Sequence, residues 1–392
     1  MIQILHLLGT VLGWLTIVVA ALGVVYSTAA ALVFRRYFAA ATLAPARHEA
    51  VTLVKPLYGD EPRLSDNLAS FIAQDHAGPI QLLCGIQRHD DPAIVVVEAL
   101  KAAHPDAQID LVIDGTVHGA SGKLSNLINM EPLIRHDVVV LSDSDIAVAP
   151  DYLAQILRAL DQPKTGLVSC VYTGRGDTGF WSHFGAAGVS YQFMLGLVFG
   201  VANKLATPCM GSTIAMTRET LRRIGGFTRF ADKLADDYAM GEAVRELGLE
   251  IAVPAMLVDH AFDETSFAAL WRHELRWGAT VRDVAFWPYV GIIIGLPLPV
   301  AVLSVLYWPT VGLILCALAV VARLVVVRTV DATVGRRIAP WWMALAHDGM
   351  SFALYIASFF VRSVDWRGAT LTMKNDGRIV AAHKIQNAEQ RA

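Results

Sequence analysis

Residues 137–145 read DVVVLSDSD, an apolar run that ends in two aspartates separated by one serine. A short apolar run bounded by polar residues is typical of a buried strand, so Asp143 and Asp145 would follow the end of a strand. Two carboxylates at this spacing can share a divalent cation, Mg²⁺ or Mn²⁺, because these ions prefer oxygen ligands. A solvated turn is the alternative for this motif taken alone, but the acidic pairs elsewhere in the chain favour a metal site at Asp143 and Asp145.

Strand-like and helix-like segments alternate before this run. The predicted strands lie at 50–55, 80–86, 109–114 and 137–141, and the predicted helices at 64–76, 93–105 and 123–134. Such alternation predicts an α/β domain with a mostly parallel sheet and helices on both faces. Ligands of such sheets bind beyond the carboxyl ends of the strands. The motifs QRHDDP (87–92) and SDSD (142–145) follow two of these strands, so we expect them to meet in one site.

Two further acidic pairs are candidate functional residues. Asp90 or Asp91 could accept hydrogen bonds from a nucleotide, and we favour Asp91, although either could instead cap the helix that follows. Asp236 and Asp237 open an amphipathic helix in LADDYAMG, where capping and compensation of the helix dipole are the alternative. We predict that Asp237 takes a proton from a hydroxyl nucleophile as a general base. Asp236 would then cap the helix or shape the surroundings of that base.

Residues 267–284, FAALWRHELRWGATVRDV, predict an amphipathic helix at a membrane surface. Interfacial anchoring explains its Trp and Arg residues, and a role in binding is compatible with it. Arg276 could meet a diphosphate bidentately, and Trp277 could pack beside an acceptor. Lys123, in HGASGKLSNL, could reach a nucleotide or be an ordinary loop lysine.

Apolar segments flank the domain at both ends. Residues 4–34 contain no Lys, Arg, Asp or Glu and are too long for a signal peptide, so we predict a retained transmembrane helix. Basic residues follow it, which places the domain in the cytoplasm. Three apolar segments come later, at 284–308, 310–327 and 339–361, although His347 and Asp348 weaken the last as a simple span. Counting these helices puts the C-terminus outside, whereas the basic tail favours inside, and both alternatives stay open.

The predicted organisation has five parts. They are an N-terminal transmembrane helix (1–36), a cytosolic catalytic domain (50–264), an interface helix (265–284), C-terminal transmembrane helices (285–363) and a polar tail (364–392). The chain is 55% hydrophobic and only 17% charged, which suits a membrane protein. Its net charge of −3 gives no reason to expect nucleic acid as a partner.

The motif order QRHDDP, DSD, ADDY and HELRW, with VKPLYGDEP and KLSNL, resembles ceramide glucosyltransferases and their bacterial relatives, which include hopanoid-associated lipid glycosyltransferases. The resemblance runs from roughly Val51 to Arg282. It implies a GT-A fold (a nucleotide-diphospho-sugar transferase domain), a UDP-sugar donor, a divalent metal and a lipid acceptor. Its matching positions assign nucleotide binding to Asp91, the metal to Asp143 and the base to Asp237, while Asp145 completes an Asp-x-Asp that the animal enzymes lack and is the second candidate metal ligand. The candidate nucleotide-sugar-binding residues are, in full, Lys55, Asp90, Asp91, Lys123, Asp143 and Arg276. Trp277 follows Arg276 in the Arg-Trp motif, which relatives begin with Gln or Arg; here His273 stands in that place, near the acceptor.

The resemblance implies an inverting transfer of a single glucose or N-acetylglucosamine to ceramide or a hopanoid such as bacteriohopanetetrol, by an enzyme of the bacterial inner membrane. Two alternatives remain from the sequence. One is a processive polysaccharide synthase of the same superfamily, which usually carries Gln at the first motif position and more membrane spans. The other is a non-catalytic membrane scaffold or transporter, which would leave the acidic clusters unexplained.

Overall fold

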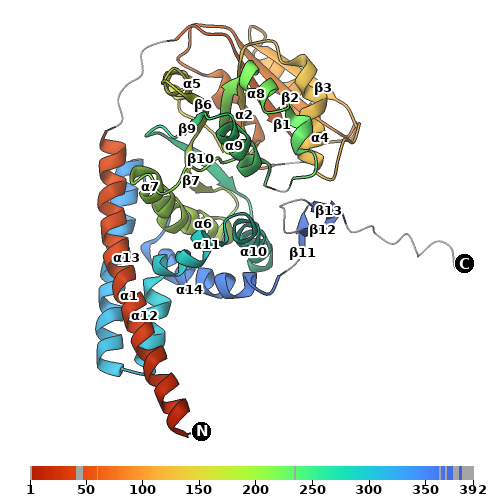
Figure 1. The fold of residues 1–392 in the computed structure, drawn as a ribbon. Helices are drawn as coiled ribbons and strands as arrows, with labels where there is room; N and C mark the ends of the chain where they lie inside the picture. Colours follow the sequence, from red (N-terminus) through yellow and green to blue (C-terminus); the bar gives the residue numbers. More distant parts are fainter. Residues whose placement is uncertain are drawn as a thin grey trace, which may run out of the picture.

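The computed structural model describes residues 2–40, 47–59, 61–233 and 235–361, and beyond these the backbone of three short strands up to residue 381. Figure 1 shows an α/β domain that sits at one end of a bundle of long helices. The helices α1 (Ile2–Ala39) and α13 (Pro309–Val334) run side by side along this bundle, and α12 (Pro297–Val305) packs against both.

A seven-stranded sheet forms the centre of the domain, in the order β3-β2-β1-β4-β8-β6-β9. The strands β1 (Val51–Pro56), β2 (Ile80–Ile86), β3 (Gln108–Ile113) and β4 (Val138–Leu141) pair in parallel. The helices between them are α2 (Leu64–Ile72), α3 (Ala93–Ala103) and α4 (Gly122–Met130). The predicted α/β class and the parallel half of the sheet are therefore confirmed.

The second half of the sheet is mixed. The strand β8 (Ile214–Thr217) is antiparallel to β4 and to β6 (Thr165–Ser169), and β6 pairs in parallel with β9 (Glu250–Ala252). Between these strands lie α5 (Tyr152–Leu160), α8 (Arg218–Arg223) and α9 (Asp236–Glu246). Short 3-10 turns at Glu131–Leu133 and Phe227–Phe230 complete this part.

A separate three-stranded sheet lies between the central sheet and the helices near the bundle (Figure 1). Its strands are β5 (Ile146–Ala147), β10 (Leu257–Phe262) and β7 (Val171–Gly176), with β10 in the middle. Because β5 directly follows the Asp-x-Asp motif, this small sheet connects the motif to residues that are distant in sequence.

A long apolar segment, Phe180–Ala202, follows β7. It comprises α6 (Phe180–Gly188), a π-helical turn (Val189–Phe193) and α7 (Met194–Ala202). It is one of three helices long and apolar enough to span a membrane among the described residues, the others being His6–Ala39 and Pro309–Val334. More than half of its most apolar window is buried inside the protein, however. The sequence did not lead us to expect this segment.

After the domain, the chain forms α10 (Phe267–Val284), α11 (Phe286–Gly291), a 3-10 turn (Ile292–Gly295) and then α12. The stretch from α11 to α12 is bent by 66° and forms at most one broken span. The residues Pro297 and Pro299 at the start of α12 cannot continue a preceding helix, which accounts for the break.

The last predicted span differs from the expectation. The helix α14 (Trp341–Ser358) does not reach the apolarity of a membrane span. It packs against α6 and α10 and crosses beneath the domain at a steep angle to α1 and α13 (Figure 1). Its polar residues His347 and Asp348 are both buried in contacts with the protein.

The packing of α13 and α14 indicates on which side of the membrane the chain continues after α13. The rings of Trp14 and Trp308 lie 5.3 Å apart at the far end of the bundle, so α13 starts there and runs toward the domain. Because α14 packs against α6 and α10 instead of crossing back, the described chain from the end of α13 to Val361 stays on the domain side. This agrees with the basic residues near the C-terminus rather than with the helix count. The predicted tail, 364–392, lies mostly outside the described residues, apart from the backbone of β11 (Ser363–Trp366), β12 (Ala369–Met373) and β13 (Ile379–Ala381).

A buried ion pair fixes α14 to the bundle. Arg323 of α13 contacts Asp348 of α14, and both side chains are almost completely buried. Arg323 also donates a hydrogen bond of 3.1 Å to the carbonyl of Tyr191 in the π-helical turn. One charged side chain therefore joins α13, α14 and the π-helical turn.

We expect Asp348→Ala to destabilise the protein by about 3–5 kcal/mol, because it leaves a buried guanidinium without its counter-charge. The melting temperature of the purified protein in detergent measures the effect. The double variant Arg323→Met/Asp348→Leu removes both charges and should melt above the single variant. A single variant that melts like the parent protein would show that this pair does not hold α14.

Candidate active site

A buried lysine, Lys55, holds the loop that carries the Asp-x-Asp motif. Lys55 lies near the end of β1, and its Nζ donates to the Ser142 hydroxyl at 3.0 Å and to the Asp143 carbonyl at 2.8 Å. The Phe71 ring covers the same ammonium at 3.4 Å. Burial lowers the pKa of Lys55 to about 7. The contacts of Lys55 with the described residues are thus structural: it holds the loop that carries Asp143.

A second lysine brings two of the acidic motifs together. Lys123, at the start of α4, has its Nζ 2.7 Å from Asp143 Oδ1 and 3.3 Å from Asp236 Oδ2. Burial by itself would lower the pKa of Lys123, but the carboxylates of Asp143 and Asp236 outweigh it and raise that pKa. Lys123 is therefore a permanently charged centre of the cluster rather than a loop lysine.

Asp237 lies next to this cluster. Its Oδ2 accepts a hydrogen bond from the Gly211 amide at 3.1 Å, and its Oδ1 accepts one from the Tyr238 amide at 2.7 Å. Burial and the neighbouring Asp236 raise the pKa of Asp237 to about 6. A carboxyl group with such a pKa is suited to accept a proton near neutral pH.

Gly211 allows the close approach of these groups. A Cβ at this position would lie 2.5 Å from Asp143 Oδ2, so a side chain would displace the carboxylate.

Asp236 does not cap α9, which has no side-chain cap, so the prediction that Asp236 caps this helix is wrong. Burial also raises the pKa of Asp236.

Asp145 points to a different partner. Its Oδ2 lies 3.4 Å from His260 Nε2 on β10. Asp145 Oδ1 and His260 Nδ1 are both buried and make no hydrogen bond with the part of the chain that the structure describes. The sequence did not indicate His260, because an isolated histidine carries no motif and becomes recognisable only through the pairing of β10 with β5.

The helix α10, which carries Arg276 and Trp277, contacts the site through the ring of His260. The ring of Trp277, on α10, lies 5.7 Å from that of His260 and 4.3 Å from that of His273. His273 forms an ion pair with Glu264, which is almost completely buried. Arg276 is half-buried on the same helix. The structure thus brings Trp277 to the side of the site where Asp145 and His260 lie and gives His273 a partner of its own.

Asp90 and Asp91 differ in exposure and in their partners. Asp90 is exposed and pairs with Arg88, whose Nε is 2.9 Å from Asp90 Oδ1. Asp91 is buried, and its carboxylate accepts hydrogen bonds from the amides of Gly59 at 3.0 Å and of Ala93 at 3.0 Å. Asp91 therefore binds the first residue of α3 and the loop after β1. Neither residue contacts the Lys123 cluster through a described hydrogen bond or ion pair.

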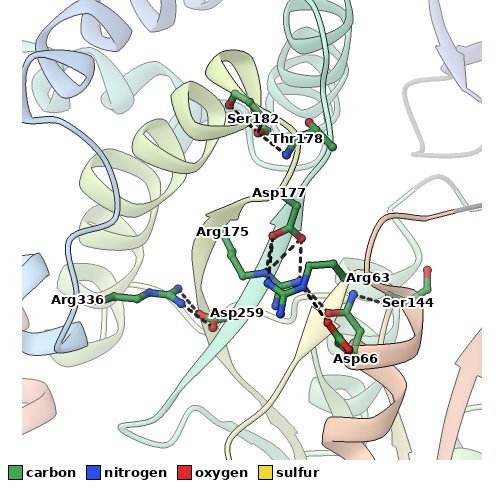
Figure 2. A network of polar contacts seen from close by, with 11 residues as sticks. Arg63, Asp66, Ser144, Arg175, Asp177, Thr178, Ser182, Asp259 and Arg336 are labelled. Atoms are coloured by element: carbon green, nitrogen blue, oxygen red, sulfur yellow. Dashed lines mark hydrogen bonds and ion pairs between the residues drawn. The ribbon is translucent and has the colours of Figure 1, made fainter. Parts of the chain in front are cut away.

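A polar network supports the site from the side of β7 (Figure 2). Arg175 pairs with Asp177 at 2.9 Å and donates to Asn67 Oδ1 at 2.8 Å. The side-chain amide of Asn67 in turn donates to the carbonyl of Ser144, at the centre of the Asp-x-Asp motif, at 3.2 Å. The backbone of the motif is thereby fixed on both sides, since Lys55 holds the adjacent carbonyl.

Figure 2 also shows how the domain is attached to the bundle. Arg336 follows α13, and its guanidinium donates to both carboxylate oxygens of Asp259, at 2.6 and 3.0 Å. Asp259 is the residue before His260 on β10. The end of an apolar helix is therefore linked directly to the strand that contributes to the site.

Comparisons with known proteins agree with this geometry. The family model for glycosyl transferase family 21 matches residues 15–379. Ceramide glucosyltransferase 1 of Caenorhabditis elegans is 26% identical over 205 residues, which are 52% of this chain and 43% of that protein. Ceramide glucosyltransferase of Komagataella phaffii is 30% identical over 125 residues, 30% of this chain and 24% of that protein. The matches thus span less than half the length of these relatives.

Among solved structures, the mannosyltransferase PcManGT of Pyrobaculum calidifontis, in complex with GDP-Man and Mn²⁺, superposes with a TM-score of 0.50 at 20% identity. The match covers 87% of this chain and 99% of that one, and it shows a common GT-A fold. The match to the family model extends over nearly the whole sequence. The chain therefore has a GT-A fold and belongs to glycosyl transferase family 21.

Proposed function

We propose that this enzyme transfers a single sugar, glucose or N-acetylglucosamine, from a UDP-sugar to a lipid hydroxyl with inversion. Ceramide or a hopanoid polyol is the proposed acceptor, and the matched ceramide glucosyltransferases support the former. The observation that carries the proposal is Asp237, a carboxylate with a raised pKa beside Asp143 and Lys123, in a domain attached to apolar helices.

Asp237 is the proposed general base. The acceptor hydroxyl gives its proton to Asp237 while its oxygen attacks the anomeric carbon, and the bond from that carbon to the UDP oxygen breaks. The amides of Gly211 and Tyr238 hold the carboxylate in place. The matched structure of the mannosyltransferase contains a nucleotide sugar and Mn²⁺, which supports a diphosphate-linked donor for this chain as well.

Asp145 and His260 fit a divalent metal, because Asp145 Oδ2 lies 3.4 Å from His260 Nε2 and the buried Asp145 Oδ1 has no hydrogen-bond partner among the described residues. Asp143 is the other proposed ligand. The described residues contain no cluster of three or more His, Cys, Asp or Glu side chains placed for a metal. Magnesium commonly uses one or two carboxylates together with substrate phosphates. When bound, such an ion would neutralise charge on the diphosphate.

The remaining predicted residues have proposed roles in binding. Lys123 and Arg276 supply positive charge for the departing diphosphate, and Asp91 shapes the nucleotide side through the loop at Gly59. Trp277 and His273 lie on α10, which packs against α14 and connects the site to the apolar helices. We propose that the lipid enters from this side, and that the domain faces the cytoplasm of a bacterial inner membrane, as the basic residues Arg35 and Arg36 favour.

We expect Asp237→Asn to abolish transfer while UDP-sugar binding is retained, because the amide keeps the shape but cannot accept the proton. Purified protein is incubated with radiolabelled UDP-glucose or UDP-N-acetylglucosamine and with ceramide or bacteriohopanetetrol. The lipid products are separated on thin-layer plates. The loss should be at least about 100-fold, as is usual for a general base.

Asp106→Asn is the matched control, because Asp106 is exposed in the turn after α3 and has no assigned role. A single glycolipid from the parent protein supports the proposal, whereas a polymer made from UDP-sugar alone would support the processive alternative. Substantial turnover by Asp237→Asn would refute the role of the base.

The rate should fall as the pH drops through about 6, because Asp237 becomes protonated there. The groups nearest to it are Asp236, Lys123 and Asp143. Since the negative charge of Asp236 raises the pKa of Asp237, Asp236→Asn should move the midpoint of the kcat profile to a lower pH. A midpoint that is unchanged or higher in this variant would contradict the coupling.

A further inference from the structure

A cavity of about 620 Å³ opens between α1 and α13 near their domain-proximal ends. Arg35 and Phe38 of α1 line it on one side, and Arg328, Thr329 and Thr333 of α13 line it on the other. The volume lies within the range of small-molecule sites, about 300–1,000 Å³. The cavity is separate from the active site, and none of its residues has a role in the proposed reaction.

Among the described residues, none neutralises the positive charge of this cavity. Arg35 and Arg328 are exposed, and neither forms an ion pair or side-chain hydrogen bond with any described residue. By contrast, Arg336, just after α13, is paired with Asp259. Two unpaired guanidinium groups from two helices therefore face one space that contains threonine hydroxyls. Such guanidinium forks bind the oxygens of a phosphate or a carboxylate bidentately.

The cavity lies at the level expected for lipid headgroups. Just beyond it, Tyr37 of α1 contacts the Val253 carbonyl, and Arg336 after α13 contacts Asp259, so both helices meet the domain there. On the other side, toward the centre of the bundle, Leu32 is 53% exposed and Val325 is 40% exposed. These apolar side chains offer a surface for acyl chains, which a free phosphate ion would not use.

We propose that this cavity binds the phosphate of an anionic phospholipid, with Arg35 and Arg328 on the phosphate and the acyl chains along α1 and α13. Basic pockets between transmembrane helices on the cytoplasmic side are suited to acidic headgroups. The site does not depend on the proposed reaction, because it is defined by binding alone.

The test measures the binding of fluorescent phosphatidylglycerol to the full-length protein in neutral detergent. Unlabelled dioleoylphosphatidylglycerol, dioleoylphosphatidylcholine and inorganic phosphate serve as competitors. The double variant Arg35→Gln/Arg328→Gln should bind about 30-fold more weakly, which corresponds to about 2 kcal/mol at 1.4 kcal/mol per decade. Competition by phosphatidylglycerol should far exceed that by phosphatidylcholine or phosphate.

Arg36→Gln is the matched control. Arg36 is the neighbour of Arg35 on α1, is also exposed, has no described ion pair, and does not line the cavity. Its affinity should stay within about twofold of the parent value, and Arg35→Lys/Arg328→Lys, which keeps both charges, should retain most of the binding. Equal losses in the control and the double variant would overturn the proposal in favour of unspecific surface charge. Full competition by inorganic phosphate would overturn it in favour of a free anion.

Discussion

The contact of Lys123 with Asp143 and Asp236 is the interaction on which the active site depends. Carboxylates in a buried region repel one another and resist ionisation. The ammonium of Lys123, 2.7 Å from one and 3.3 Å from the other, allows them to remain close together. It joins the starts of α4 and α9 to the end of β4, three segments far apart in the sequence. Burial and the charge of Asp236 raise the pKa of Asp237, and Lys123 opposes this shift.

The part of the fold that could be predicted is the part built from neighbouring segments. The strands β1 to β4 alternate with helices, and their burial makes them continuous apolar runs, so the parallel half of the sheet followed from the sequence. The expected meeting of the two loops did not follow, because Asp91 is held by the Gly59 and Ala93 amides and makes no described contact with Asp143. The antiparallel β8 and the small sheet around β10 depend on pairing between distant segments. A two-residue strand such as β5 has no periodicity to detect, and His260 was missed for that reason.

The membrane-side helices show a different limit of sequence reasoning. Residues 339–361 are apolar on average, but the two polar side chains of α14 meet partners that only the folded chain provides: Asp348 meets Arg323, and His347 lies 2.9 Å from Glu274. These contacts hold α14 against α13 and α10. The same helix therefore places Trp277 and His273 beside the apolar helices, where a lipid could approach the site.

The central claim is that the acidic motifs form one site for a nucleotide diphosphate and a metal ion. An experimental structure of the protein with UDP and Mn²⁺, with the metal located by its anomalous scattering, tests it most directly. We expect the ion to be coordinated by Asp145 and by Asp143 or His260, with the diphosphate on the same side as Asp237 and Arg276. An ion and nucleotide bound on a surface away from Asp237 would contradict the account.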